Sequence, residues 1–169
     1  MYTGLAKARN AGESCIRRPR DCSGFSLLEL MAAVAIASLL GVVAVPLYEE
    51  QVDKAKRARA IADIKIIEVQ IERFHSDNAR LPGTLTDLGV LVPADPWGKA
   101  YQYLNIVDAD NQGKGKLRKD KNLVPINSDY DLYSLGKDGE CASPLTAQKS
   151  QDDIVRANNG GYVGLASEY

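Results

Sequence analysis

The sequence of 169 residues is poor in the side chains that most enzymes use for catalysis. It has a single histidine, His75, and shows no Ser-His-Asp set, Cys-His pair, glycine-rich phosphate loop or zinc-ligand spacing. No second histidine or cysteine accompanies it, so we interpret His75 as a surface or capping residue. An enzyme built from this chain would need carboxylate-only chemistry, so we expect a structural protein and no enzymatic activity.

Cysteine is also scarce, and its distribution excludes a disulfide framework for most of the chain. Cys15 and Cys22 lie within the first 24 residues, and Cys141 is the third. If the first 24 residues are removed, one cysteine remains and no intrachain disulfide can form. We therefore expect the thiol of Cys141 to be free or buried.

Charge is unevenly spread along a chain whose net charge is only −1. Residues 1–24 carry five lysines and arginines against two acidic residues, a net charge of +3, which leaves about −4 for the remainder. A basic tail before an apolar run indicates membrane targeting, and an acidic body argues against nucleic acid as a partner. The later basic cluster, residues 114–121, has no interleaved aromatic residues, so it also predicts no nucleic-acid binding.

A long apolar run covers residues 25–48 and reads "FSLLELMAAVAIASLLGVVAVPLY", with Glu29 as its only charge. As a helix, 24 residues span ~36 Å, which is enough to cross the hydrocarbon core of a bilayer. The basic residues precede the run, so the N-terminal tail should stay cytoplasmic while the C-terminal part crosses. The polar break at Gly24 comes before the run, so cleavage there would leave the anchor on the chain.

Glu29 is an unusual residue for a membrane helix, where a carboxylate costs roughly 2.5–3.5 kcal/mol. This cost falls if a cation meets the carboxylate in the low-dielectric layer, and the α-amino group of a neighbouring subunit is the natural candidate. Such a pair would set the axial register between subunits. The alternative is that Glu29 simply snorkels to the interface of a plain single-pass anchor.

The start of the run, "GFSLLE", resembles the processing motif of type IV prepilins. The resemblance implies that a prepilin peptidase cuts after Gly24, that Phe25 becomes the N-methylated terminus, and that Glu29 is the assembly glutamate. Pro46 falls at the helix-breaking proline typical of these stems. Its ring removes a backbone hydrogen bond, which predicts a kink or local melting near Val42.

Residues 49–81 predict the amphipathic half of a stem helix. Apolar residues recur at three- and four-residue steps, as expected for a helix laid on a core, at Ala58, Ile61, Ile64, Ile67, Ile71 and Phe74. The charged residues among 68–73 should face solvent. The helix should end near "NARLPG", residues 78–83, where proline and glycine stop it.

The remainder of the chain predicts a small β-containing head. "AYQYLNIV" and "DYDLYSLG" alternate and are rich in aromatic and β-branched residues, so we expect two strands there. "DPWG" is a predicted turn, and Trp97 is interpreted as a packing anchor between sheet and stem. The intervening "DADNQGKGKLRKDKN" is interpreted as a solvated connection.

The head segments "DPWGKAYQYLN" and "DYDLYSLGKDG" resemble the major pseudopilins of type II secretion systems, from Gly24 through Gly139. The resemblance implies an α+β, type IV pilin-like lollipop, with a long N-terminal helix packed on a small antiparallel sheet. It divides the chain into a cleaved basic leader (1–24), a transmembrane and assembly helix (25–48), the amphipathic half of the stem (49–81), and a periplasmic head with a C-terminal loop (82–169).

The same resemblance implies a structural subunit held in the bacterial inner membrane by a single pass. It would polymerise with identical subunits into a helical filament, the periplasmic pseudopilus, which drives protein export across the outer membrane. Its partners would be the prepilin peptidase, minor pseudopilins and an inner-membrane assembly platform. Two alternatives stay open: a type IV pilus pilin for adhesion, motility or DNA uptake, and a sensor or enzyme that merely kept the anchor.

The family resemblance further implies a structural Ca²⁺ in the C-terminal loop. Its ligands would be the carbonyl of Leu135, the carboxylate of Asp138, and one or both of Asp152 and Asp153. The chain departs from the family here, because "ECASPLTAQKSQ" lengthens the loop and residues 152–169 continue past the expected end. The alternative is that Asp152 and Asp153 begin a short helix or are solvated charges.

Overall fold

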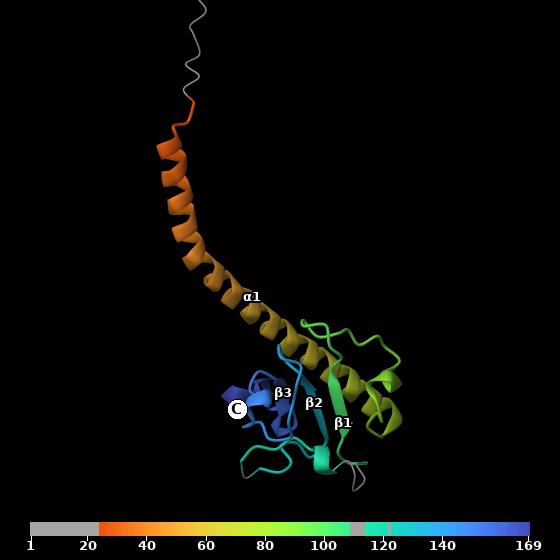
Figure 1. Ribbon diagram of the computed structural model, residues 1–169. Helices are drawn as coiled ribbons and strands as arrows, with labels where there is room; N and C mark the ends of the chain where they lie inside the picture. The colour runs from red at the N-terminus through yellow and green to blue at the C-terminus, as the bar shows by residue number, and fades with distance from the viewer. Residues whose placement is uncertain (1–23, 109–113, 122) are drawn as a thin grey trace, which may run out of the picture. The chain divides into compact units, whose positions relative to one another are not determined.

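The computed structural model describes residues 24–108, 114–121 and 123–169 (Figure 1). The predicted leader, apart from Gly24, and part of the polar connection lie outside the described residues. The chain divides into two compact units, one ending at Val43 and the other covering Ala44–Tyr169.

A single long helix, α1 (Leu27–Asn78), provides both the apolar segment and the amphipathic segment predicted from the sequence. Pro46 lies inside α1, and the residues around Val42 are helical. The sequence predicted either a kink or local melting of the helix at this proline. The prediction of local melting is therefore wrong. A proline removes one backbone hydrogen bond, and the turns on either side keep theirs.

The second half of α1 buries one stripe of side chains against the head. Ile64, Ile67 and Ile71 are buried, as the periodicity predicts, and Ala60 completes the stripe. Ala58 was predicted in place of Ala60, and this was wrong because Ala58 is exposed. Two residues correspond to about 200° around a helix, which places Ala58 on the opposite face.

The C-terminal end of α1 lies within the predicted segment. The helix ends at Asn78, and Ala79 adopts a left-handed conformation with φ of 53°. The Ala79 N–H donates to the carbonyl of His75 at 2.8 Å, and His75 is exposed in the last turn. The interpretation of His75 as a surface residue at the helix end is confirmed.

Four antiparallel strands follow α1 and pair in chain order: β1 (Gln102–Asn105), β2 (Tyr130–Ser134), β3 (Ile154–Ala157) and β4 (Tyr162–Leu165). The first two confirm the predicted strands. The last two were not predicted, because they lie beyond the end expected from the family. The short helix considered for Asp152 is wrong, since the chain turns there and enters β3 at Ile154.

The sheet is covered on both faces. One face packs on α1 through a core of Ala60, Ile64, Ile67, Ile71, Tyr101, Tyr130, Leu132 and Ile154. The other face is covered by loop and C-terminal residues, in a second core of Ile126, Leu145, Val155, Ala157 and Ala166. Successive residues of β3 contribute to opposite cores, so β3 is buried on both sides.

The turn "DPWG" and its tryptophan support the first core as predicted. The Gly98 N–H donates to the Asp95 carbonyl at 2.9 Å, and Gly98 has a φ of 88° that glycine adopts readily. Trp97 packs against the core between α1 and the sheet. Its role as a packing anchor is confirmed.

A buried arginine links α1 to the sheet beside this core. Arg156 of β3 donates to Glu68 of α1 at 2.8 Å and to Asp129 at 2.7 Å, and its guanidinium lies 4.0 Å from the Tyr130 ring centre. Glu68 was predicted to be solvated, and this was wrong because it is the partner of Arg156. The ion pairs fix which face of α1 contacts the sheet.

Candidate functional site

The predicted processing site lies in an accessible segment just before α1. Gly24, Phe25 and Ser26 are non-helical, and 84% of the Phe25 surface is exposed. A side chain added at Gly24 would have no neighbour within 4 Å. Among the described residues, none covers the Gly24–Phe25 peptide bond, and cleavage there stays a prediction.

Ser26 caps the helix that follows. Its carbonyl accepts the N–H of Leu30 at 3.1 Å, and its hydroxyl oxygen accepts the N–H of Glu29 at 3.2 Å. Glu29 is thus the third residue of α1, in the first turn. A carboxylate is favourable at this end of a helix, because the unpaired N–H groups there carry partial positive charge.

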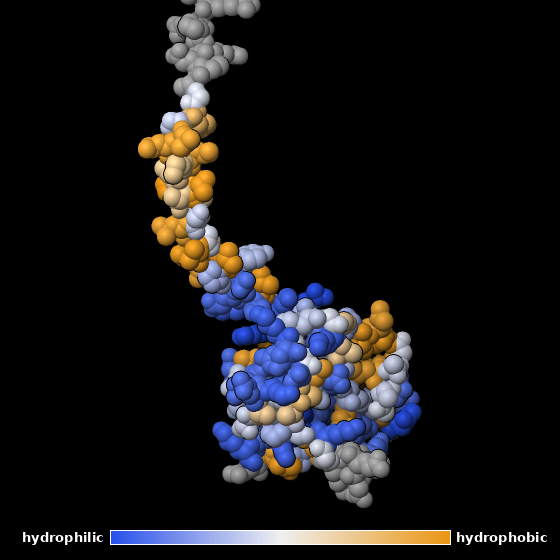
Figure 2. Space-filling view, viewed as in Figure 1, coloured by the Kyte–Doolittle hydropathy of each residue, from blue (hydrophilic) through white to orange (hydrophobic). Residues whose placement is uncertain are grey.

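Glu29 lies among exposed apolar side chains and makes no ion pair with another described residue. In the face that Figure 2 shows, apolar side chains make up most of the surface of the N-terminal half of α1. The exposed ones include Leu27, Leu28, Leu30, Met31, Val34, Ile36, Leu39 and Leu40. This part of α1 is long and apolar enough to cross a membrane, and none of its most apolar window is buried within the structure. Such a helix needs lipid or other helices around it.

The second candidate site is the C-terminal loop, where a calcium ion was predicted. The Asp152 carboxylate accepts the backbone N–H groups of Lys137 at 2.8 Å and Asp138 at 3.0 Å. A Cβ at Gly136 would collide with the Asp152 carbonyl oxygen, so only glycine allows this approach. The structure thus brings Asp152 against the turn that contains Leu135 and Asp138.

Asp153 differs from the other predicted ligands because it is fully buried and already has a cationic partner. The Nη2 atom of Arg118 lies 2.5 Å from Asp153 Oδ2, and Arg118 is also buried. Burial raises the pKa of the Asp153 carboxyl to about 7, while the neighbouring guanidinium opposes the rise. Arg118 was predicted to belong to a solvated basic cluster, and this was wrong.

These contacts test how well the loop fits a metal. Among the residues that the structure describes, no three Asp, Glu, His or Cys side chains are arranged to hold an ion. Asp153 Oδ1 has no hydrogen-bond partner among the described residues and could bind an ion. A divalent ion ~4 Å from a guanidinium is, however, repelled by roughly 8 kcal/mol at an effective dielectric constant of about 20. The predicted set of Leu135, Asp138, Asp152 and Asp153 therefore fits Ca²⁺ poorly at Asp153, and the calcium site stays a prediction.

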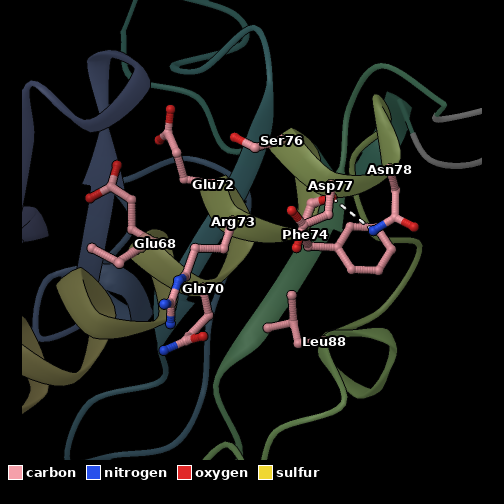
Figure 3. A pocket seen from close by; sticks show the side chains of 10 residues that line it. Glu68, Gln70, Glu72, Arg73, Phe74, Ser76, Asp77, Asn78 and Leu88 are labelled. Carbon is pink, nitrogen blue, oxygen red and sulfur yellow. Dashed lines mark hydrogen bonds between the residues drawn. The ribbon is translucent and has the colours of Figure 1, made fainter.

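A pocket beside α1 is lined mostly by residues of that helix (Figure 3). It is lined by Glu68, Val69, Gln70, Glu72, Arg73, Phe74, Ser76, Asp77, Asn78 and Leu88. The lining includes no histidine or cysteine, and the Asn78 amide is bonded to the Phe74 carbonyl at 2.9 Å. Elsewhere, Cys141 is exposed and forms no disulfide with another described residue, so of the two states expected for its thiol, free or buried, burial is wrong.

Comparisons with known proteins agree with both the anchor and the head. A family model described as the prokaryotic N-terminal methylation motif matches residues 19–45, which include Gly24, Phe25 and Glu29. No solved structure matches the chain significantly.

Curated relatives match most of the chain. It is 31% identical over 142 residues to the type II secretion system core protein G of Pseudomonas aeruginosa, covering 72% of this chain and 87% of the relative. The protein of the same name from Dickeya chrysanthemi is 30% identical over 158 residues, covering 81% and 87%. That from Vibrio cholerae is 29% identical over 145 residues, covering 74% and 87%. The chain belongs to the family of type II secretion system core protein G.

Proposed function

We propose that this chain is cleaved after Gly24, methylated on Phe25, and polymerised through its apolar helix into the pseudopilus of a type II secretion system. It acts as a structural pseudopilin subunit, and its role requires no enzymatic chemistry of its own. The relatives named for this secretion system support the assignment to a secretion filament over a pilus fibre.

The observation that carries the proposal is the apolar half of α1, whose side chains are exposed and whose only charge is Glu29. In a membrane these side chains contact lipid, and in a filament they contact the same helix of other subunits. Exchanging lipid for protein gives little hydrophobic gain, so packing and polar pairs decide how helices associate. Glu29 is the polar group available for such a pair.

The partner proposed for Glu29 is the new α-amino group of Phe25 on a neighbouring subunit. Cleavage after Gly24 creates this cation, so subunits can pair only after processing. Because Phe25 and Glu29 lie at the same end of the helix, each pair fixes one axial step between neighbours. Processing by the peptidase is thereby coupled to assembly.

The charge distribution supports the proposed location and partners. Five basic residues precede the anchor, which favours a cytoplasmic N-terminus in the inner membrane and a head on the periplasmic side. The prepilin peptidase would meet the chain at Gly24. Identical subunits, minor pseudopilins and an inner-membrane assembly platform would then act on the processed helix to extend the periplasmic filament.

The first test is the N-terminus of the chain recovered from membranes of its source organism. We expect mass spectrometry to find a chain that begins at N-methylated Phe25. Gly24→Val should retain the leader, because a branched side chain obstructs the cleaved bond. Gly41→Val, a matched change further along the apolar run where an added Cβ has no neighbour within 4 Å, should be cleaved normally.

A wild-type chain that keeps residues 1–24 in cells with an active prepilin peptidase would favour a plain anchored protein.

A further inference from the structure

Arg118 is a buried cation in a segment that the sequence presents as solvated. Only 2% of its surface is exposed, although it lies among lysines in residues 114–121. Its guanidinium stacks over the ring of Tyr133, 4.4 Å from the ring centre. Tyr133 packs against the second core, so Arg118 lies on the face of the sheet opposite α1.

The arginine joins three parts of the head. Its Nη2 binds Asp153 directly before β3, and its Nη1 donates to the Ala142 carbonyl at 2.8 Å in the long loop between β2 and β3. Its backbone N–H donates to the Asp131 carboxylate of β2 at 2.9 Å. One residue therefore contacts β2, the residue directly before β3, and the loop that connects the two strands.

Backbone hydrogen bonds extend the same junction. The Lys119 N–H donates to the Ser143 carbonyl at 3.0 Å, and the Leu145 N–H donates to the Lys119 carbonyl at 2.8 Å. The segment that carries Arg118 therefore pairs with "ECASPLTAQKSQ", the insertion that lengthens this loop relative to the family pattern.

The charges at this junction require a cation. Asp131 and Asp153 are each at most 1% exposed, and burial raises the pKa of both carboxyl groups. Buried carboxylates remain ionised only when they are paired or hydrogen-bonded. Among the described residues, the other buried arginine, Arg156, contacts Glu68 of α1 on the opposite face. Arg118 is the buried cation that pairs with Asp153.

We propose that Arg118 is a built-in cation of the C-terminal loop, doing in this chain what the family resemblance assigned to Ca²⁺. The guanidinium neutralises Asp153 and connects the loop between β2 and β3 to the sheet. The C-terminal part of the head is therefore kept in place without a bound metal. The inference concerns the folding of the head and stands independently of filament assembly.

The decisive experiment follows thermal unfolding of the full chain in a mild detergent, using the fluorescence of Trp97. This is the only tryptophan, and it packs against the core of the head. We expect the Tm of the wild-type chain to differ by less than about 1 °C between saturating calcium and excess chelator. A bound structural ion would instead raise the Tm by several degrees under saturation.

Substitutions at the ion pair provide the second measurement. Arg118→Met leaves Asp153 buried and unpaired, so we expect the Tm to fall by roughly 10 °C. Adding Asp153→Asn should recover part of the loss, because it removes the uncompensated charge. The matched control is Lys149→Met, which breaks an exposed pair with Glu140 in the same loop and should shift the Tm by less than about 2 °C.

Two results would overturn the proposal. One is a rise of several degrees in the wild-type Tm on adding calcium, and the other is an Arg118→Met chain that melts like Lys149→Met. If the Arg118→Met chain does not fold, Arg118→Lys replaces it as a variant that keeps the positive charge. The effect of calcium on the Tm of the wild-type chain then still tests the proposal.

Discussion

Glu29→Ala should abolish assembly of the chain into filaments while leaving its membrane insertion and its cleavage after Gly24 intact. The substitution makes the apolar run more hydrophobic, so insertion is not impaired. It removes the carboxylate that we propose pairs with the α-amino group of Phe25. Without that pair, helices in lipid have little to fix their axial register. Cross-linking of neighbouring subunits in isolated cell envelopes measures the effect.

Two further variants make the Glu29 prediction specific. Glu29→Gln keeps the shape and loses the charge, so it should fail like Glu29→Ala if the charge is what matters. Ser38→Ala changes a different polar residue of the same helix, whose hydroxyl only bonds to the Val34 carbonyl at 2.7 Å, and should assemble normally. Normal filaments from the Glu29→Gln chain would show that the register does not depend on an ion pair.

Removing residues 154–169 should unfold the head. This truncation deletes β3 and β4, and β3 lies inside the sheet with Ile154, Val155 and Ala157 each at most 1% exposed. Burial of one large aliphatic side chain contributes about 1.5–3 kcal/mol, and a domain has only about 5–15 kcal/mol of net stability. Because β3 supplies side chains to both cores, neither core survives its removal.

The truncated chain should show no cooperative transition in Trp97 fluorescence and should be digested rapidly by a protease added to detergent-solubilised chain. Deleting Tyr169 alone gives a graded control. It removes a ring 5.1 Å from that of Tyr162 and a hydrogen bond to Asn158, and should cost only about 1 kcal/mol. A truncated chain that still melts cooperatively would show that residues 154–169 are a dispensable extension.

The sequence predicted the parts of the fold whose residues follow a simple period. Ile64, Ile67 and Ile71 recur at helical spacing and are buried in α1, and the alternating segments around Tyr103 and Leu132 form β1 and β2. The exposed apolar half of α1 and its single carboxylate were also predictable. These features depend on local periodicity, which a sequence shows directly.

The C-terminal hairpin had a readable signal that was missed. "IVRA" and "YVGL" are short strand-like runs separated by "NNGG", and asparagine and glycine between two such runs favour a hairpin. Asn158 and Asn159 adopt φ of 54° and 52°, values that asparagine tolerates. The resemblance to the family ends at Gly139, so the residues beyond it were treated as an extension and not as part of the sheet.

The burial of Arg118 had no comparable signal. It lies between Leu117 and Lys119 in a polar, lysine-rich segment, and nothing local distinguishes it from the solvated lysines around it. Its environment is created by Asp153 and Ala142, which lie 35 and 24 residues further along the chain. Contacts of this kind are set by tertiary packing, which periodicity does not reveal.

The central claim, that this chain builds a secretion filament, is tested most directly by comparing the extracellular proteins of its source organism with and without the gene. We predict that deletion removes a defined set of extracellular proteins, and that the wild-type chain restores them while the Glu29→Ala chain does not. An unchanged set of extracellular proteins, together with loss of long surface fibres, would contradict the claim and identify the chain as a pilus subunit.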